Sequence, residues 1–232
     1  MAPTNDHGQP IGQDLAGWTP PDPITPITLQ GRTVVLEPAH RMQHTIPLFH
    51  ALRAGEDSLW TYMPWGPFQD AAELGQLIDR LNGLEDWVPY VAIVDGNVCG
   101  LCCYLRIDPP GGVIEIGGIS WAPSLQRTPA ATEAIHLLID HAFALGYRRV
   151  EWKCDALNEP SRQAAERFGF TYEGTFAKAT HYKGRNRDTA WFAIVDDDWP
   201  KLGARMRTWL DPANFDEAGR QRRRMSELLI GS

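Results

Sequence analysis

The sequence predicts an α/β protein of the α+β type, with a mixed, mostly antiparallel central sheet of about seven strands flanked by helices. Two observations carry this prediction. The chain begins with one strand, two helices and then three strands in succession, which is typical of an antiparallel run. A helix, a strand, a second helix and two further strands follow, so that a crossover helix can join parallel neighbours. Together the two runs favour a mixed sheet over a doubly wound Rossmann domain.

The first half of the chain contributes the antiparallel run. Asp70 is a residue type that caps helices, so we expect it to begin the second helix. Asp95 and Gly96 separate two apolar runs and predict a tight hairpin. The pair Gly117 and Gly118 inside the third of these strands predicts a bulge or a close backbone approach by a ligand. The expected strands cover residues 32–38, 88–94, 98–107 and 113–122, and the expected helices cover residues 41–52 and 70–84.

The second half of the chain carries the strongest helical signal. From Ala131 onward apolar residues recur at the helical period, and Gly146 is expected to end this helix. Asn158 is a residue type that caps helices, and Gly169 is expected to stop a short helix after it. Strands are expected over residues 148–154, 170–182 and 188–195, the last two joined by a polar turn.

Three regions follow from this organisation. Residues 1–31 are rich in proline and show no periodic pattern, so we expect an extended or poorly ordered arm. Residues 32–195 hold the predicted strands and helices and form the folded domain. Residues 196–232 are expected to form a C-terminal extension of one or two helices.

Composition excludes several classes of protein. The chain has 232 residues, and its 22 Lys and Arg against 29 Asp and Glu give a net charge of −7, which argues against binding to nucleic acid or to an anionic membrane. We find no apolar run long enough to span a bilayer and no secretory signal, so we expect a cytoplasmic protein. Four cysteines lie among apolar residues, which predicts buried, reduced thiols and no metal site; they are Cys99, Cys102, Cys103 and Cys154.

Two segments indicate the chemistry. The segment SLQRTPAATEA, residues 124–134, joins a central strand to the strongest helix, where small residues and the helix N-terminus suit a pyrophosphate, although an ordinary loop fits equally well. The second segment is NEPSRQAAERFGF, residues 158–170. Both occur at the expected points of the element order. Over residues 32–195 the chain therefore resembles the GCN5-related N-acetyltransferases, and specifically their RimJ/RimL branch of ribosomal-protein N-terminal acetyltransferases.

The resemblance implies that acetyl-CoA is the acetyl donor. In the family, backbone amides of the loop after the fourth strand hold the pyrophosphate, and an asparagine and the residue three positions later reach the pantetheine and the sulfur. Pro129 stands where the family usually has a glycine, so one amide contact is lost or supplied by a neighbour. The residues implied in cofactor binding are Ser120, Trp121, Gln126, Arg127, Thr128, Pro129, Ala130, Ala131, Thr132, Asn158 and Ser161.

Two residues are candidates for catalysis. Glu115 lies on the central strand near the position of the base in histone-acetylating members of the superfamily, and a carboxylate there could take a proton from the amine. The alternative is a solvated or salt-bridged strand carboxylate. Many relatives carry a tyrosine as general acid where this chain has Ala165. Either Ser161 or a bound water protonates the departing sulfur, or the thiolate leaves unaided.

The acceptor is expected to be a primary amine, either a protein N-terminus or a small molecule. Trp60, Tyr62, Trp65 and Phe68 lie in the loop that flanks the acceptor side in the family and could form a substrate wall together with Glu115, although core aromatics are the commoner outcome. A homodimer is possible. The alternative function, suggested by Pro129 and Ala165, is a non-catalytic acyl-CoA-binding or regulatory protein on the same scaffold.

Overall fold

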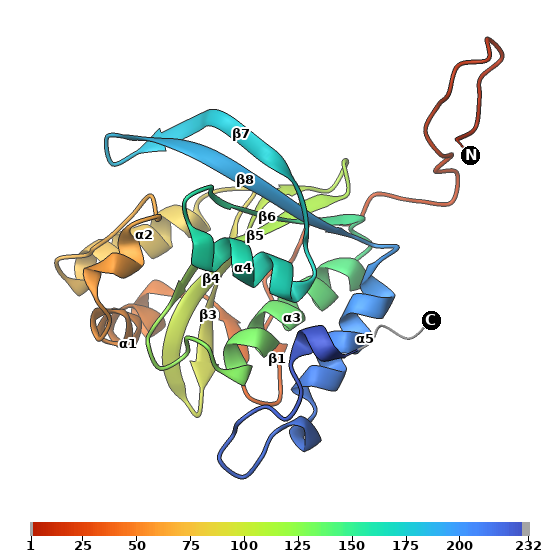
Figure 1. Cartoon of the computed structure of the whole chain (residues 1–232). Helices are drawn as coiled ribbons and strands as arrows, with labels where there is room; N and C mark the ends of the chain where they lie inside the picture. Colours follow the sequence, from red (N-terminus) through yellow and green to blue (C-terminus); the bar gives the residue numbers. More distant parts are fainter. Residues whose placement is uncertain (1, 229–232) are drawn as a thin grey trace.

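The computed structural model describes residues 2–228, which contain one eight-stranded sheet (Figure 1). Its strand order is β1-β2-β3-β4-β5-β6-β8-β7, and the neighbours are antiparallel except for the parallel pair β5 and β6. The predicted mixed, mostly antiparallel sheet is therefore confirmed. The strands are β1 (Leu29–Gln30), β2 (Val35–Pro38), β3 (Val88–Val94), β4 (Asn97–Asp108), β5 (Val113–Trp121), β6 (Arg149–Asp155), β7 (Thr171–Tyr182) and β8 (Arg185–Val195).

Helices cover both faces of the sheet (Figure 1). On one face α1 and α2 pack against β3 and β4, around a core that includes Leu101, Cys103 and Leu105. On the opposite face α3 packs against β5, β6 and α5, around a core that includes Cys102 and Tyr104. Because β4 is buried on both faces, its sequence is almost continuously apolar. The helices are α1 (Arg41–Arg53), α2 (Ala71–Asn82), α3 (Pro129–Ala144), α4 (Glu159–Phe168) and α5 (Trp199–Leu210).

The local signals in the sequence act as predicted. The side chain of Asp70 accepts the N–H of Glu73 at 3.0 Å and caps α2. Asp95 and Gly96 have φ values of 49° and 77° and form the tight turn between β3 and β4. Gly169 ends α4 with a φ of 97°, a conformation that favours glycine. All four cysteines are buried free thiols, also as predicted.

The structure differs from the sequence prediction in the last third of the chain. The turn between β7 and β8 is shorter than predicted, because Lys183 and Gly184 adopt positive φ and β8 already begins at Arg185. After α5 the described residues 211–228 contain two short 3₁₀ turns, η2 (Pro212–Asn214) and η3 (Met225–Glu227), and no second α-helix. Pro212 starts the first of these turns, and Gly219 adopts a φ of 73°. Residues 229–232 lie outside the described part of the chain.

The predicted arm lies partly on the domain. Leu29, at the end of the arm, pairs with Leu36 and belongs to β1, a strand that the sequence analysis did not predict. With two residues, β1 is too short to show an alternating pattern. Ile24 and Leu29 are buried in the core under α3, and the ring of Trp18 lies 5.3 Å from the guanidinium carbon of Arg148. The preceding residues, red in Figure 1, loop away from the domain.

One buried carboxylate fixes the point where the arm joins the domain. Glu133 of α3 accepts the N–H of Arg32 at 2.9 Å and both the N–H and the hydroxyl of Thr33. Replacing Glu133 with Ala leaves these partly buried donors without their acceptor. We expect the free energy of unfolding to fall by about 1–3 kcal/mol in denaturant titrations. Glu85→Ala, a change at an exposed position, should stay within about 0.5 kcal/mol of the parent; equal effects of the two changes would contradict the role of Glu133.

Candidate active site

The site is organised by the separation of two parallel strands. β5 and β6 pair over Val113–Glu115 and Arg149–Glu151, and the pairing ends there although both strands continue. β5 leads into α3 and β6 leads into α4, so both helix N-termini follow the carboxyl ends of the separated strands. Helix N-termini present N–H groups that favour anions. We call the separated strands together with these two helix N-termini the splay.

The N-terminus of α3 is capped by its own sequence. Thr128 is the N-cap: its Oγ1 accepts the N–H of Ala131 at 3.2 Å and donates to the carbonyl of Leu125 at 2.7 Å. Pro129 lies in the first turn, where its missing N–H removes no intrahelical bond. The N–H of Ala130 meets no acceptor within residues 2–228. The loop therefore keeps a free amide for an anion in spite of Pro129.

The other residues of the first segment divide between the surface and the core. Gln126 and Arg127 are exposed; Gln126 donates from Nε2 to the carbonyl of Trp121 at 2.8 Å, and Arg127 has a φ of 61°. Ser120 is fully buried. Thr132 is also buried, and its hydroxyl accepts a hydrogen bond from an arginine of α4. The exposed pair can reach a bound phosphate, whereas Ser120 and Thr132 lie under the surface.

The N-terminus of α4 places a hydroxyl beside β6. Asn158 caps the helix by accepting the N–H of Ser161 at 3.3 Å, as predicted. Trp152 donates from Nε1 to Oγ of Ser161 at 3.0 Å, so Ser161 accepts this bond and still has its own hydroxyl proton to donate. Burial raises the pKa of the neighbouring Cys154 thiol, against a smaller opposing effect of its hydrogen bond with Ser161. Ala165 is fully buried in the core.

A chain of alternating charges crosses β4, β5, β6 and β7 at the splay. Glu115 is 4% exposed in its side chain, and its Oε2 contacts Nη1 of Arg106 at 2.5 Å and Nζ of Lys153 at 3.1 Å. Nζ of Lys153 also lies 2.7 Å from Glu151. Opposite charges so placed offset part of the cost of burying each group. The six members in order are Arg106, Glu115, Lys153, Glu151, Arg149 and Glu173.

Glu115 faces the bulge that the glycine pair forms. The register between β4 and β5 shifts beside Gly117 and Gly118, and Gly118 has a φ of 61°, which confirms the predicted bulge. A Cβ at position 117 would lie 3.3 Å from Oε1 of Glu115, so the second carboxylate oxygen points toward this backbone. Burial raises the pKa of Glu115, whereas Arg106 and Lys153 act to lower it. A carboxylate with a raised pKa is a better proton acceptor than an ordinary one.

The aromatic loop between α1 and α2 is mainly core. Trp60 is buried and packs edge to face on Phe68 at 5.2 Å between ring centroids, and Tyr62 is half-buried. Trp65 is buried as well, but its ring lies over the bulge, where a Cβ at Gly118 would be 3.4 Å away. Trp65 is thus placed at the bulge that Glu115 also faces.

The loop is joined to the hairpin of β7 and β8. Lys183, in the turn of this hairpin, donates from Nζ to the carbonyl of Trp60 at 2.7 Å and to that of Trp65 at 3.2 Å. Figure 1 shows the hairpin reaching beyond the rest of the sheet on the side of α2. The aromatic loop, which is expected to flank the acceptor, therefore contacts the hairpin of β7 and β8.

Sequence reasoning missed the partners of Glu115. Its ion-pair partners are Arg106 on β4 and Lys153 on β6. Nζ of Lys153 lies 3.7 Å from the ring of Trp191, on a third strand. One signal was available: Arg149, Glu151 and Lys153 alternate with apolar residues along one strand, which marks a charged face. Which charges oppose one another depends on strand register.

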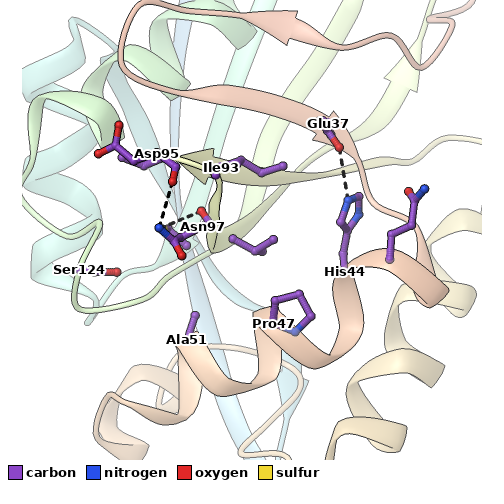
Figure 2. A pocket seen from close by; sticks show the side chains of 13 residues that line it. Glu37, His44, Pro47, Ala51, Ile93, Asp95, Asn97 and Ser124 are labelled. Atoms are coloured by element: carbon purple, nitrogen blue, oxygen red, sulfur yellow. Dashed lines mark hydrogen bonds and ion pairs between the residues drawn. The ribbon is translucent and has the colours of Figure 1, made fainter.

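A separate pocket of about 810 Å³ lies on the other side of β4 from β5. Figure 2 shows it between α1 and the β3–β4 turn, with His44 pointing toward Glu37 and Asn97 opposite them. Of the described residues that line it, Ser124 alone comes from the loop before α3. Burial lowers the pKa of His44, and its Nδ1 accepts the N–H of His40. Since β5, β6 and α4 contribute nothing to its lining, this pocket is distinct from the splay.

Comparisons with known proteins identify the class. The model of the acetyltransferase (GNAT) family matches residues 53–170. A GCN5-related N-acetyltransferase from Brucella melitensis is 43% identical, covers 92% of this chain and 98% of its own, and superposes with a TM-score of 0.89. A probable GNAT-family acetyltransferase from Chromobacterium violaceum is 39% identical, over 83% of this chain and 98% of its own, with a TM-score of 0.79.

A third relative bears on the branch. YdaF of Bacillus subtilis, named "Putative ribosomal N-acetyltransferase", is 31% identical over 51% of this chain; the match spans 63% of YdaF, less than two thirds of its length. RimL, described as a ribosomal L7/L12 alpha-N-protein acetyltransferase in complex with coenzyme A, shares the fold at 20% identity with a TM-score of 0.65. The chain belongs to the GNAT acetyltransferase family and is an N-acetyltransferase. The likeness to YdaF supports its similarity to the RimJ/RimL branch, and RimL shares the fold.

Acetyl-CoA is the acetyl donor of this family, and the splay fits it. The free N–H of Ala130 at the start of α3 suits a phosphate, and the unpaired edges of β5 and β6 beyond Glu115 and Glu151 can accept an extended amide-containing chain. No helix within the described residues is long and apolar enough to cross a membrane. Residues 2–228 also contain no group of His, Cys, Asp and Glu arranged to hold a metal ion.

The contact of Lys183 with the aromatic loop leads to a test by hydrogen exchange. Lys183→Met removes a charged donor from two carbonyls, so amide exchange over residues 60–67 should rise about fivefold, the factor that about 1 kcal/mol corresponds to. Lys178→Met, at an exposed lysine on the same hairpin, is the matched control. Unchanged exchange in Lys183→Met, or an equal rise in both variants, would show that Lys183 does not hold the loop.

Proposed function

We propose that this chain transfers the acetyl group of acetyl-CoA to the primary amine of a protein N-terminus or of a small molecule, by direct attack of the amine on the thioester at the splay. The observation that carries the proposal is Glu115, a buried carboxylate beside the bulge at the point where β5 and β6 separate. The names of YdaF and RimL support a protein N-terminus as the acceptor.

The donor is held by the segments that the family resemblance indicates. Exposed Gln126 and Arg127, with the amide of Ala130, are placed to bind the pyrophosphate, and Asn158 with Ser161 to bind near the sulfur. The N–H of Ala131 already donates to Oγ1 of Thr128, so this capping bond must break before the amide of Ala131 can bind a phosphate as well. Ser120 and Thr132 support the site from within the core and do not contact the donor, since both are buried.

The reaction requires one proton to leave the amine and one to reach the sulfur. The carboxylate of Glu115 takes the proton of the attacking amine, whose nitrogen forms a bond to the thioester carbonyl carbon while the carbon–sulfur bond breaks. The hydroxyl of Ser161, which accepts from Trp152, gives its proton to the departing thiolate and takes one back from water, and Glu115 releases its proton to solvent. An α-amine with a pKa near 8 needs less help from a base than a lysine does, which agrees with an N-terminal acceptor.

The aromatic loop contributes a wall to the acceptor side. We infer that Trp65, which lies over the bulge, contacts the acceptor, and that Tyr62 borders it. Trp60 and Phe68 pack on each other and support the loop from within.

Turnover tests the proposal directly. Free-thiol release from acetyl-CoA, measured with a panel of peptides, polyamines and aminoglycosides, should be stimulated by at least one amine. Binding of acetyl-CoA by calorimetry with no stimulated release would favour the alternative of a non-catalytic acyl-CoA-binding protein, which Pro129 and Ala165 suggest. Absence of any binding would contradict both functions.

The pH dependence tests Glu115. The carboxylate helps only where it is deprotonated and the amine is still protonated, between its own raised pKa and that of the amine. Glu115→Gln should therefore lower kcat/KM most in this window, and the loss should shrink at higher pH. Glu166→Gln, an exposed carboxylate on α4, is the control; a loss of equal size at every pH would assign Glu115 to structure.

Ser161 is tested by removing its hydroxyl. Ser161→Ala should lower kcat by about 10²-fold, the lower range for a positioned proton donor, with acetyl-CoA binding little changed. Ser124→Ala, at an exposed serine on the loop before α3, should leave kcat unchanged. A kcat within about twofold of the parent in Ser161→Ala would show that water or unaided departure handles the thiolate.

A further inference from the structure

We propose that Arg106 is a specificity-determining residue: in the free protein its guanidinium occupies the place of the acceptor's ammonium group beside Glu115, and a cationic acceptor displaces it. This inference rests on the proposed function, since it names what the acceptor amine meets at that site. It selects cationic amines over uncharged nucleophiles.

The strand geometry places Arg106 there by an irregularity. Leu105 pairs directly with Glu115, so both side chains lie on the face of α1 and α2. Regular alternation would send the next residue to the opposite face. Instead the register shifts between Leu105 and Asp108, and Arg106 adopts a φ of 48°, which is costly for a residue with a Cβ. This bulge keeps Arg106 on the same face, where Nη1 contacts Glu115 at 2.5 Å.

The two cations on Glu115 are held very differently. The side chain of Lys153 is 6% exposed and is fixed by Glu151 at 2.7 Å and by the ring of Trp191 at 3.7 Å. The side chain of Arg106 is 56% exposed and is anchored by its contact with Glu115. Arg106 can therefore swing into solvent, where its charge is hydrated, while Lys153 stays in place.

Charge balance explains why the place must be refilled by a cation. The series of ion pairs that runs from Arg106 to Glu173 contains three positive and three negative side chains. When Arg106 leaves, the remaining five groups carry one net negative charge, and the buried Glu115 must share its remaining cationic partner, Lys153, with Glu151, which is costly. An ammonium group restores the balance, but an uncharged nucleophile does not. The nitrogen of the acceptor then lies beside the carboxylate that takes its proton.

Turnover with a stimulating amine provides the first test. Arg106→Gln should lower the KM for a cationic acceptor about two- to fivefold, the factor that a partly exposed ion pair corresponds to, and leave acetyl-CoA affinity unchanged. Glu115 is faced by Arg106 from β4 and by Lys153 and Glu151 from β6, so removing one cation raises its pKa and moves the acid limb of kcat/KM to higher pH. An unchanged or raised KM with an unmoved acid limb would overturn the proposal.

Arg207→Gln is the matched control. The side chain of Arg207 is also 56% exposed and lies 3.7 Å from a carboxylate, that of Asp140, but it belongs to α5 on the opposite face of the sheet. The variant should change neither the acceptor KM nor the acid limb.

A second measurement needs no turnover. CoA-saturated protein is titrated with n-butylammonium while the Nε–H signal of Arg106 is followed by NMR, assigned by its loss in Arg106→Gln. The signal should move to that of a solvent-exposed guanidinium while the signal of Arg207 stays. A signal of Arg106 that does not respond overturns the proposal even if acetyl transfer is established. If no amine stimulates thiol release, the proposed function fails, and this titration alone decides the place of Arg106.

Discussion

The parallel contact between β5 and β6 is the constraint on which the site depends. This contact extends only as far as Glu115 and Glu151. Beyond these residues the facing edges of the two strands pair neither with each other nor with another strand. Backbone N–H and C=O groups at such edges require partners. The two helices that follow the strands bring their N-termini to the same end, so the topology alone creates a site for an extended ligand with an anionic group.

A network of ion pairs lies on the part of the sheet that α1 and α2 leave uncovered. Between β4 and β7 the face below the splay is not an apolar core but the alternating chain of charges, with Trp191 covering Lys153. Buried ion pairs of this kind add little to stability compared with apolar packing, but removing one member is costly. The series of ion pairs is therefore suited to holding a carboxylate in one orientation. Arg106, at its exposed end, is the member that another cation can replace.

The sequence predicted the elements whose signals are local. Asp70, Asn158 and Gly169 act at their own positions through capping, and the glycine pair acts through the bulge, so no tertiary information is required. β1 was missed because two residues are too short for a pattern. Of the one or two helices expected after residue 195, the described residues contain one, α5. For the site, resemblance to the family led to the prediction of Glu115 and Ser161, and their catalytic roles stay predictions. Arg106 was missed because its orientation arises from a register shift that only strand pairing reveals. The cytoplasmic location and the homodimer stay predictions.

Hydrogen exchange with and without CoA shows whether the donor binds at the splay, since it maps the bound ligand without an acceptor. We expect slower exchange in the first turns of α3 and α4, residues 130–132 and 159–162, and along the facing edges of β5 and β6. Residues 93–99 and the part of α1 at the pocket of Figure 2 should be unaffected. Protection at that pocket with none at the two helix N-termini would show that the donor does not bind at the splay.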